Sequence, residues 1–467
     1  MTRFQVFSST FFTYLAFLLV FFIYYSGAER VGGYLFIASN LAICILCILG
    51  LLWKNTQTVS LKNTFFLFMF VFMGTTPFLE YANDVTYWGR VKPSYDALVY
   101  SNIIIILSIL IFIASYIIGY NGRAIAKTFD KSNSYLSDIV KSSPKLGVCT
   151  VFTLAIFSCY MTADYNNFNL LSLFFRGGDF DRLEVSRSTL LIYIYVIKPI
   201  PVMAMLYIWL YKGNESYRLL LWFLFFMCLV FVAPTSLPRF YAVTLYLPLI
   251  ICYTQFFDRY FSYQISFVFG VLLIFPMLNG FRYYSSTFDI SKFSLSYDFF
   301  FSGHFDAYQN LTKVVELELI TYGHQFLGVI AFAFPRSFWP DKPIGSGAFL
   351  AKQEGLFFET ISMPLVAEGY LNFGMLGVIL FISIFGYFAG SLDTFYQNLR
   401  IKKEKHFILP IYFIFIGLSL LVLRGDLLSS FAYTVSLTAT FVFMILVSIL
   451  SILIWKNIKR LICCNNG

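Results

Sequence analysis

Residues 334–343 form the segment of this chain best suited to chemistry, because they gather charged and aromatic side chains between prolines. The segment reads Phe-Pro-Arg-Ser-Phe-Trp-Pro-Asp-Lys-Pro. Arg336 offers a rigid fork of donors that matches a phosphate group, and Lys342 adds a point charge. The prolines exclude a continuous helix. We therefore expect the segment to bind an anion, with Trp339 stacking on a sugar ring or joining the aromatic belt of a membrane surface.

Further arginines lie near predicted membrane boundaries on the same side as this segment: Arg176, Arg239, Arg282 and Arg424. Together with Arg336 and Lys342 they could converge on one anionic headgroup. Each alone could equally be an interfacial cation that anchors the end of a helix. The set as a whole predicts a phosphate-binding site.

Lys198 lies near the middle of a predicted span, next to Pro199 and Pro201. An ammonium inside the membrane is costly and indicates either a substrate contact or a buried ion pair. The prolines would break the helix locally and free carbonyl groups for the ammonium. Lys198 therefore joins the candidate substrate-binding residues.

Proton transfer would need a group that titrates near neutral pH or a carboxylate at the mouth of a span. His324 precedes a short apolar segment close to the cationic loop and suits a general base. Glu368 is a comparable candidate, and equally a salt-bridge partner for an arginine. His304 is a weaker candidate. Arg336 completes the candidate catalytic set as an electrostatic stabiliser.

Asp179 and Asp181 have the acid-x-acid spacing that some glycosyltransferases use for a divalent cation. Arg176 and Arg182 bracket the pair, which favours ion pairing over metal binding. We expect neither a metal nor a cofactor.

The elements that must position these residues are membrane helices. The chain is 59% hydrophobic and only 12% charged, about half the charged share of a soluble domain. Apolar runs long enough to cross a bilayer recur throughout, which predicts an all-α polytopic protein with about twelve spans and no separate soluble domain in 1–467. The predicted spans are 9–26, 33–53, 64–80, 98–120, 146–163, 189–211, 218–233, 238–256, 261–279, 366–390, 406–423 and 428–455.

The net charge of +9 does not indicate nucleic-acid binding, because Lys and Arg concentrate in alternate short loops. The positive-inside rule places both termini in the cytoplasm. Two enlarged loops, 163–188 and 280–365, are then extracytoplasmic. The larger should contain a helix near 305–322 and an apolar stretch, 326–334, that lies on the membrane without crossing it.

Four segments resemble the O-antigen or oligosaccharide repeat-unit polymerases of bacterial inner membranes. They are the 334–343 segment, the Gly345-Ser346-Gly347 turn, the 364–374 segment and the Arg424-Gly425-Asp426 turn. The likeness in layout extends over nearly the whole chain. It implies a GT-C-type membrane glycosyltransferase related in architecture to the O-antigen ligases. Its implied partners are membrane lipids, glycans on undecaprenyl pyrophosphate, a chain-length regulator and a flippase.

The cationic set suits the chemistry that the resemblance implies. A growing glycan would move from its lipid pyrophosphate to a hydroxyl of the next lipid-linked repeat unit, and the cations would stabilise the departing pyrophosphate. A ligase-like transferase and a lipid-linked oligosaccharide flippase are the alternatives. No internal repeat is visible, and the long 280–365 loop argues against a transporter.

Overall fold

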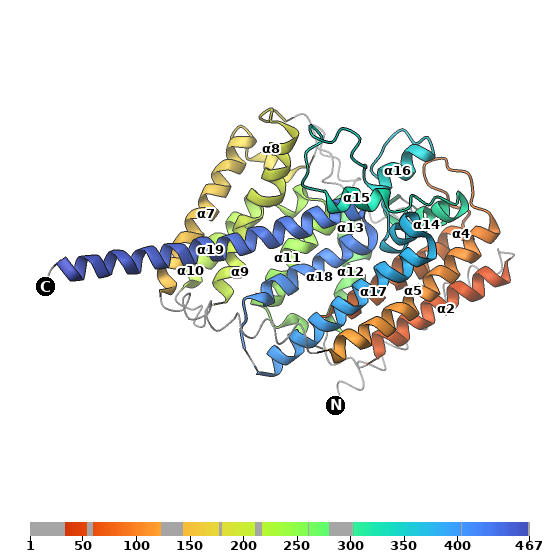
Figure 1. Ribbon diagram of the computed structural model, residues 1–467, viewed down its shortest axis with the longest axis horizontal. Helices are drawn as coiled ribbons and strands as arrows, with labels where there is room; N and C mark the ends of the chain where they lie inside the picture. Colours follow the sequence, from red (N-terminus) through yellow and green to blue (C-terminus); the bar gives the residue numbers. More distant parts are fainter. Residues whose placement is uncertain are drawn as a thin grey trace.

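The computed structural model describes residues 33–53, 59–122, 143–176, 180–210, 217–259, 261–279, 301, 303–402 and 404–465, and this part of the chain is helical without strands (Figure 1). Within it, eight helices are long and apolar enough to cross a membrane. They are Tyr34–Leu52, Leu61–Ala82, Tyr95–Asn121, Pro144–Tyr165, Ser188–Trp209, Arg218–Ser236, Leu365–Lys402 and Leu427–Lys459. The predicted all-helical membrane class is confirmed in this form.

Three of the four remaining predicted spans correspond to shorter or interrupted helices. Two apolar helices, α11 (Arg239–Tyr253) and α18 (Ile408–Arg424), overlap two of them. A third overlaps the run of α12 (Ser262–Phe269), η7 (Gly270–Ile274) and α13 (Phe275–Asn279). The first predicted span, 9–26, lies outside the described residues. The count of twelve therefore stays a prediction.

Three of the helical runs contain a widened π-type turn, and each turn comes just before a proline. These turns are η1 (Met69–Thr75), η3 (Tyr193–Ile197) and η7, which precede Pro77, Pro199 and Pro276. Proline lacks an N–H and clashes with the carbonyl four residues earlier, so the preceding turn opens. The helix break predicted beside Lys198 is therefore the π-type turn η3, which ends directly before Lys198.

Helices α5 (Tyr95–Asn121) and α17 (Leu365–Lys402) pack with their backbones in contact. A Cβ atom on Gly119 would lie 2.1 Å from the carbonyl oxygen of Tyr387, and one on Gly390 would lie 2.2 Å from that of Tyr116. Gly386, four residues before Gly390, is as crowded against α5. Small residues at this spacing allow close approach of membrane helices.

A buried carboxylate ties four helical segments together at the end of the bundle opposite the large loop. Asp393 of α17 is fully buried and accepts hydrogen bonds from the hydroxyls of Tyr116 (3.0 Å) and Tyr412 (2.7 Å). It also accepts from the backbone N–H groups of Leu61 and Lys62 at the start of α3 (Leu61–Phe68). Its cost of burial is thus offset by four donors.

The described part of the large loop contains three α-helices at the opposite end of the bundle: α14 (Ala307–Glu316), α15 (His324–Ile330) and α16 (Ser346–Gln353). The first lies inside the stretch predicted to be helical, and the second overlaps the start of the apolar 326–334 segment. Helix α17 follows and reverses sharply at Phe373 and Gly374, where the backbone is not helical. Gly369 and Gly377 meet across this reversal, since a Cβ on Gly369 would lie 2.7 Å from the Gly377 carbonyl oxygen.

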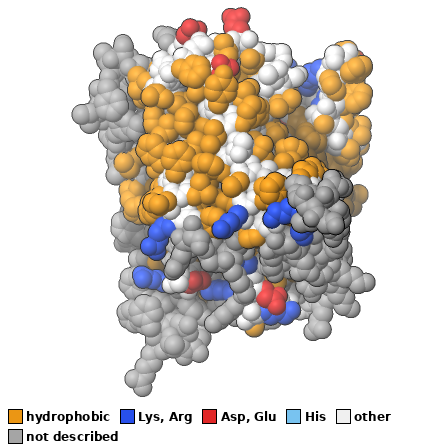
Figure 2. Space-filling model, turned by 90° about the vertical axis from the view of Figure 1, so that its left-hand side faces the viewer, with side chains coloured by type: hydrophobic (Ala, Val, Ile, Leu, Met, Phe, Trp, Pro, Cys, Tyr) orange, Lys and Arg blue, Asp and Glu red, His pale blue; other side chains and the backbone are white. Residues whose placement is uncertain are grey.

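The outer surface of the bundle is apolar, as a lipid-facing surface must be. Figure 2 shows a broad band of hydrophobic side chains with Lys and Arg along its lower edge and Asp or Glu at the top. Helix α10 (Arg218–Phe231) exposes 65% of Trp222 and 65% of Phe226. Apolar surface on this scale indicates contact with lipid or a partner.

Candidate functional site

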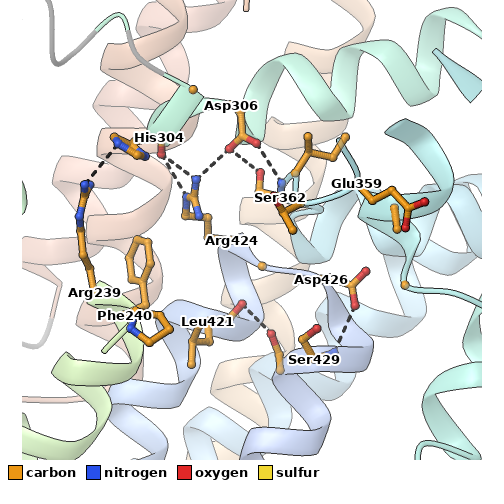
Figure 3. A pocket seen from close by; sticks show the side chains of 18 of the residues that line it. Arg239, Phe240, His304, Asp306, Glu359, Ser362, Leu421, Arg424, Asp426 and Ser429 are labelled. Carbon is orange, nitrogen blue, oxygen red and sulfur yellow. Dashed lines mark hydrogen bonds and ion pairs between the residues drawn. The ribbon is translucent and has the colours of Figure 1, made fainter. Parts of the chain in front are cut away.

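A pocket of about 970 Å³ lies where the large loop meets the ends of the membrane helices. Its lining runs in sequence from Phe72 on η1 to Tyr433 on α19 (Leu427–Asn465). The helices contribute aromatic rings, such as that of Phe240, together with Arg239 and Arg424 at their ends, and the loop side carries carboxylates and hydroxyls (Figure 3). Segments far apart in the chain therefore build one cavity.

Four arginines from four separate segments line this pocket: Arg176, Arg239, Arg336 and Arg424. Arg239 begins α11 and Arg424 ends α18. Arg176 and Arg336 come from the smaller and the larger of the two enlarged loops. All four belong to the cationic set singled out from the sequence. A cavity with several guanidinium groups attracts and orients anions.

Arg424 is held rigidly in the pocket wall. Its Nε and Nη2 atoms donate to the carbonyl oxygen of His304 at 3.2 and 2.8 Å, and Nη2 also donates to Oδ1 of Asp306 at 2.9 Å. The guanidinium lies 5.2 Å from the ring centre of Phe240. Donors placed before a ligand arrives need no reorganisation to receive negative charge.

Asp306 is the partner that orients Arg424. The residue is 1% exposed and accepts hydrogen bonds from the backbone N–H (2.9 Å) and hydroxyl (2.7 Å) of Ser362. Asn310 donates to its second oxygen at 3.0 Å. With Arg424 these donors satisfy the carboxylate, which is the condition for burying one.

The side chains of His304 and Arg239 contact each other on one side of the pocket (Figure 3). Nη2 of Arg239 lies 3.3 Å from Nε2 of His304. A guanidinium has only donors, so a hydrogen bond between these two atoms requires Nε2 to be the acceptor. The same guanidinium lies 5.9 Å from the ring centre of Phe275. His304 thus presents a basic nitrogen beside a cation.

Asp426 supports the turn between α18 and α19. Its two oxygens accept from the backbone N–H groups of Gly347 (3.0 Å) and Ser429 (3.2 Å). Burial raises the pKa of the Asp426 carboxyl above its usual value, and these backbone hydrogen bonds oppose the rise. Asp426 therefore connects the Arg424-Gly425-Asp426 turn to the Gly345-Ser346-Gly347 turn through its hydrogen bond with Gly347.

The two cations of the 334–343 segment, Arg336 and Lys342, donate hydrogen bonds to backbone carbonyl oxygens of their own loop. Arg336 donates to the carbonyl oxygens of Lys342 (2.5 Å) and Pro343 (3.1 Å). The ammonium of Lys342 donates to those of Phe332 (2.7 Å) and Phe334 (3.1 Å), and the residue is 7% exposed. Burial, with Arg336 adding to it, lowers the pKa of Lys342. Arg336 still lines the pocket, whereas Lys342 does not.

Several other predicted site residues lie away from the pocket lining. Glu368 is 1% exposed and accepts from the hydroxyl of Ser346 (2.7 Å) and the N–H of Leu427 (2.8 Å), so it joins α16, α17 and α19 instead of facing a substrate. His324 is exposed at the start of α15. Trp339 is half-buried outside the lining.

Lys198 and Arg282 complete the predicted set. The ammonium of Lys198 bonds to the hydroxyl of Ser236 at 3.2 Å, and Ser236 neighbours Thr235 of the pocket lining. Lys198 itself is not part of that lining. Arg282 lies outside the described residues.

Sequence reasoning missed Asp306, Ser362 and Trp88, which all line the pocket, and ranked His304 below His324. The signal for Asp306 was its position two residues after a histidine and directly before an amphipathic helix. Trp88 carried a weaker signal, a tryptophan followed by glycine in a short polar loop.

The combination of guanidinium groups, aromatic rings and an imidazole suits the binding of an amphiphilic anion. Among the described residues, no group of three or more His, Cys, Asp or Glu side chains is arranged to hold a metal ion. Comparisons of the chain with protein-family models, curated proteins and solved structures found no match, so the geometry of the pocket is what its function has to be argued from.

Proposed function

We propose that the protein is a membrane glycosyltransferase that polymerises a surface polysaccharide, such as O-antigen, from repeat units carried on undecaprenyl pyrophosphate. The observation that carries the proposal is the convergence of four guanidinium groups in one pocket at the end of an apolar helix bundle. We place this pocket on the periplasmic side of a bacterial inner membrane, with both termini in the cytoplasm. A GT-C-type architecture with about twelve spans belongs to the same proposal.

The arrangement of the pocket suits a lipid pyrophosphate that bears a sugar. On the helical side, Phe72, Phe240 and Phe275 form an apolar floor, with ring centres of adjacent pairs 5.1 to 6.3 Å apart. The guanidinium groups of Arg239 and Arg424 lie against this floor. A hydrocarbon chain would rest on the rings and its phosphates would meet the cations, which leaves the polar loop side for the glycan.

The reaction follows from these contacts. A hydroxyl oxygen of the acceptor repeat unit forms a bond to the anomeric carbon of the donor glycan. The bond from that carbon to the pyrophosphate breaks, and its electron pair leaves with the pyrophosphate, which the arginines stabilise. The hydroxyl proton passes to Nε2 of His304, which becomes available when the pyrophosphate draws Arg239 away from it. A single displacement of this kind inverts the anomeric configuration.

Reconstitution in liposomes tests the proposal. The purified protein is incubated with undecaprenyl-pyrophosphate-linked repeat units extracted from a strain of the source organism that lacks this gene. A ladder of longer lipid-linked glycans is the expected product. Transfer of glycan to lipid A core would instead identify a ligase, and unchanged glycan with altered leaflet exposure would identify a transporter. A chain-length regulator, if it acts as a partner, would narrow the ladder when added.

Variants of the pocket make the test specific. Arg239→Gln and Arg424→Gln should each slow elongation by about 100-fold or more, the usual effect of losing one donor to developing charge. Arg400→Gln is the matched control, because Arg400 forms an exposed ion pair with Asp258 outside the pocket lining. Normal elongation by both pocket variants would contradict the proposed pyrophosphate site.

A further inference from the structure

Trp88 is an aromatic residue of the pocket lining that has no role in the proposed reaction. It lies in the loop between α4 (Thr76–Ala82) and α5, and its indole contacts Gly303, the residue before His304. A Cβ atom on Gly303 would lie 2.5 Å from Cζ2 of the indole. The ring therefore packs against the backbone of the segment that carries His304.

The backbone at Trp88 is unusual for a bulky residue. Trp88 has φ 60° and Gly89 has φ 70°, so two successive residues occupy the left-handed region. Side chains other than glycine, asparagine and aspartate rarely adopt this conformation, and strain of this kind concentrates at functional sites. The surrounding structure must hold the indole in place against that strain.

Arg90 contacts the indole of Trp88 and is itself held by Glu354 and Asn310. Its guanidinium lies 4.7 Å from the centre of the indole ring, forms a 2.5 Å ion pair with Glu354 and donates to Oδ1 of Asn310 at 2.6 Å. The side chain of Arg90 is 2% exposed, so its geometry is tightly constrained. Asn310 in turn bonds to Asp306, which connects this support to the wall that holds Arg424.

The remaining surroundings of the indole suit a sugar. Phe358 meets its ring edge-on at 5.1 Å and 79°. Glu359 and Thr360, which follow Phe358 in the pocket lining, carry side-chain oxygens that can bind sugar hydroxyls. Figure 3 shows Glu359 on the opposite side of the pocket from Arg239. The loop side thus pairs an aromatic surface with hydrogen-bonding groups, at a distance from the phosphate-binding side.

We propose that Trp88 is the platform on which a pyranose ring of the lipid-linked glycan stacks, and that Arg90 is a positioning residue that holds the indole. The proposal rests on the proposed function and specifies its glycan subsite. The apolar C–H face of a pyranose packs on the indole, while ring hydroxyls reach the neighbouring oxygens. Trp88 then has the stacking role that the sequence suggested for Trp339.

Two probes separate the glycan subsite from the phosphate site. Farnesyl pyrophosphate carries the phosphates without a sugar, and the extracted lipid-linked oligosaccharide carries both. Trp88→Ala should weaken binding of the oligosaccharide by about 10- to 100-fold, the range measured when an aromatic stacking platform is truncated. Farnesyl pyrophosphate should bind as tightly as before, which also shows that the variant is folded. Trp88→Phe should retain most of the affinity.

Arg90→Gln should raise KM for the oligosaccharide with little change in kcat, and combining it with Trp88→Ala should give no further loss. Trp222→Ala, which removes an exposed indole from α10, is the matched control. Unchanged oligosaccharide binding by Trp88→Ala, or an equal loss for both probes, would overturn the proposal. If the wild-type protein itself fails to elongate glycans, the proposed function falls instead, whatever the Trp88 variant does.

Discussion

The Arg424–Asp306 ion pair at the pocket can be compared with a second Arg–Asp pair of nearly equal length. Arg424 and Asp306 are 2.9 Å apart, and their side chains are 18% and 2% exposed. Arg400 and Asp258 are 2.8 Å apart, and their side chains are 37% and 60% exposed. Chemistry and distance match, so a difference in coupling energy would report the effect of burial.

The expected magnitudes follow from the contacts of each pair. A hydrogen bond to a charged group contributes about 1.5–3 kcal/mol when shielded, and removal of one partner of a buried pair costs about 3–5 kcal/mol. Ser362 and Asn310 still donate hydrogen bonds to Asp306 after Arg424 is replaced, so the loss in free energy of unfolding is smaller. We expect a coupling energy of about 2–3 kcal/mol for the buried pair and below about 1 kcal/mol for the exposed pair.

Two double-mutant cycles measure these energies. One combines Arg424→Gln with Asp306→Asn, and the other combines Arg400→Gln with Asp258→Asn. The free energy of unfolding is followed by equilibrium unfolding in mixed micelles of mild detergent and sodium dodecyl sulfate. Raising the salt concentration should weaken the exposed pair more than the buried pair. Equal coupling energies for the two pairs, or a value near zero for the pocket pair, would refute the reasoning.

Two further predictions concern the large loop. Gly345→Ala should destabilise the protein by about 1–3 kcal/mol, because the new Cβ would lie 2.3 Å from Oδ2 of Asp426; thermal unfolding checks this, with Gly270→Ala, which meets nothing within 4 Å, as the neutral control. Burial raises the pKa of Glu354 above 4.5 against the opposing effect of Arg90, so the folded carboxyl keeps its proton to higher pH than the unfolded one. The free energy of unfolding should therefore fall as pH rises above 4.5, and Glu354→Gln should flatten this slope; an unchanged slope would contradict the assignment.

Hydropathy predicted the helices well because a bilayer admits few other structures. An exposed backbone polar group is too costly in lipid, so a long apolar run becomes a helix. The interruptions were harder to locate. The prolines beside Lys198 predicted a break there, but the reversal at Phe373 and Gly374 was not foreseen, because glycine is also common in uninterrupted membrane helices.

The cations of the pocket were visible in the sequence, while their partners were not. Arg239 and Arg424 stood out because each lies near a predicted membrane boundary on the same side as the 334–343 segment. Lys342 had the same signal, yet its ammonium bonds to carbonyl oxygens of its own loop. Composition cannot distinguish these cases, because every residue carries a carbonyl group. Asp306 went unnoticed because its role depends on a contact with α18, more than a hundred residues away in sequence.

The choice between Trp339 and Trp88 shows the same limit. Proximity in sequence to Arg336 favoured Trp339, whereas the fold brings Trp88 to the pocket from a loop far earlier in the chain. Neighbours in a helix bundle are set by which helix ends meet. A single sequence contains that information only through packing, which residue types and spacing do not reveal.

The pocket depends on both early and late parts of the chain, and this has a consequence for how the protein is made. Phe72 and Trp88 come from the part of the chain that is synthesised first, whereas Arg424, Asp426 and Tyr433 belong to α18, α19 and the turn between them. Synthesis proceeds from the N-terminus. The cavity is therefore complete only after α18 and α19 have inserted beside the earlier helices. A chain truncated before α18 would keep most of its membrane helices and would lack the part of the pocket that carries Arg424.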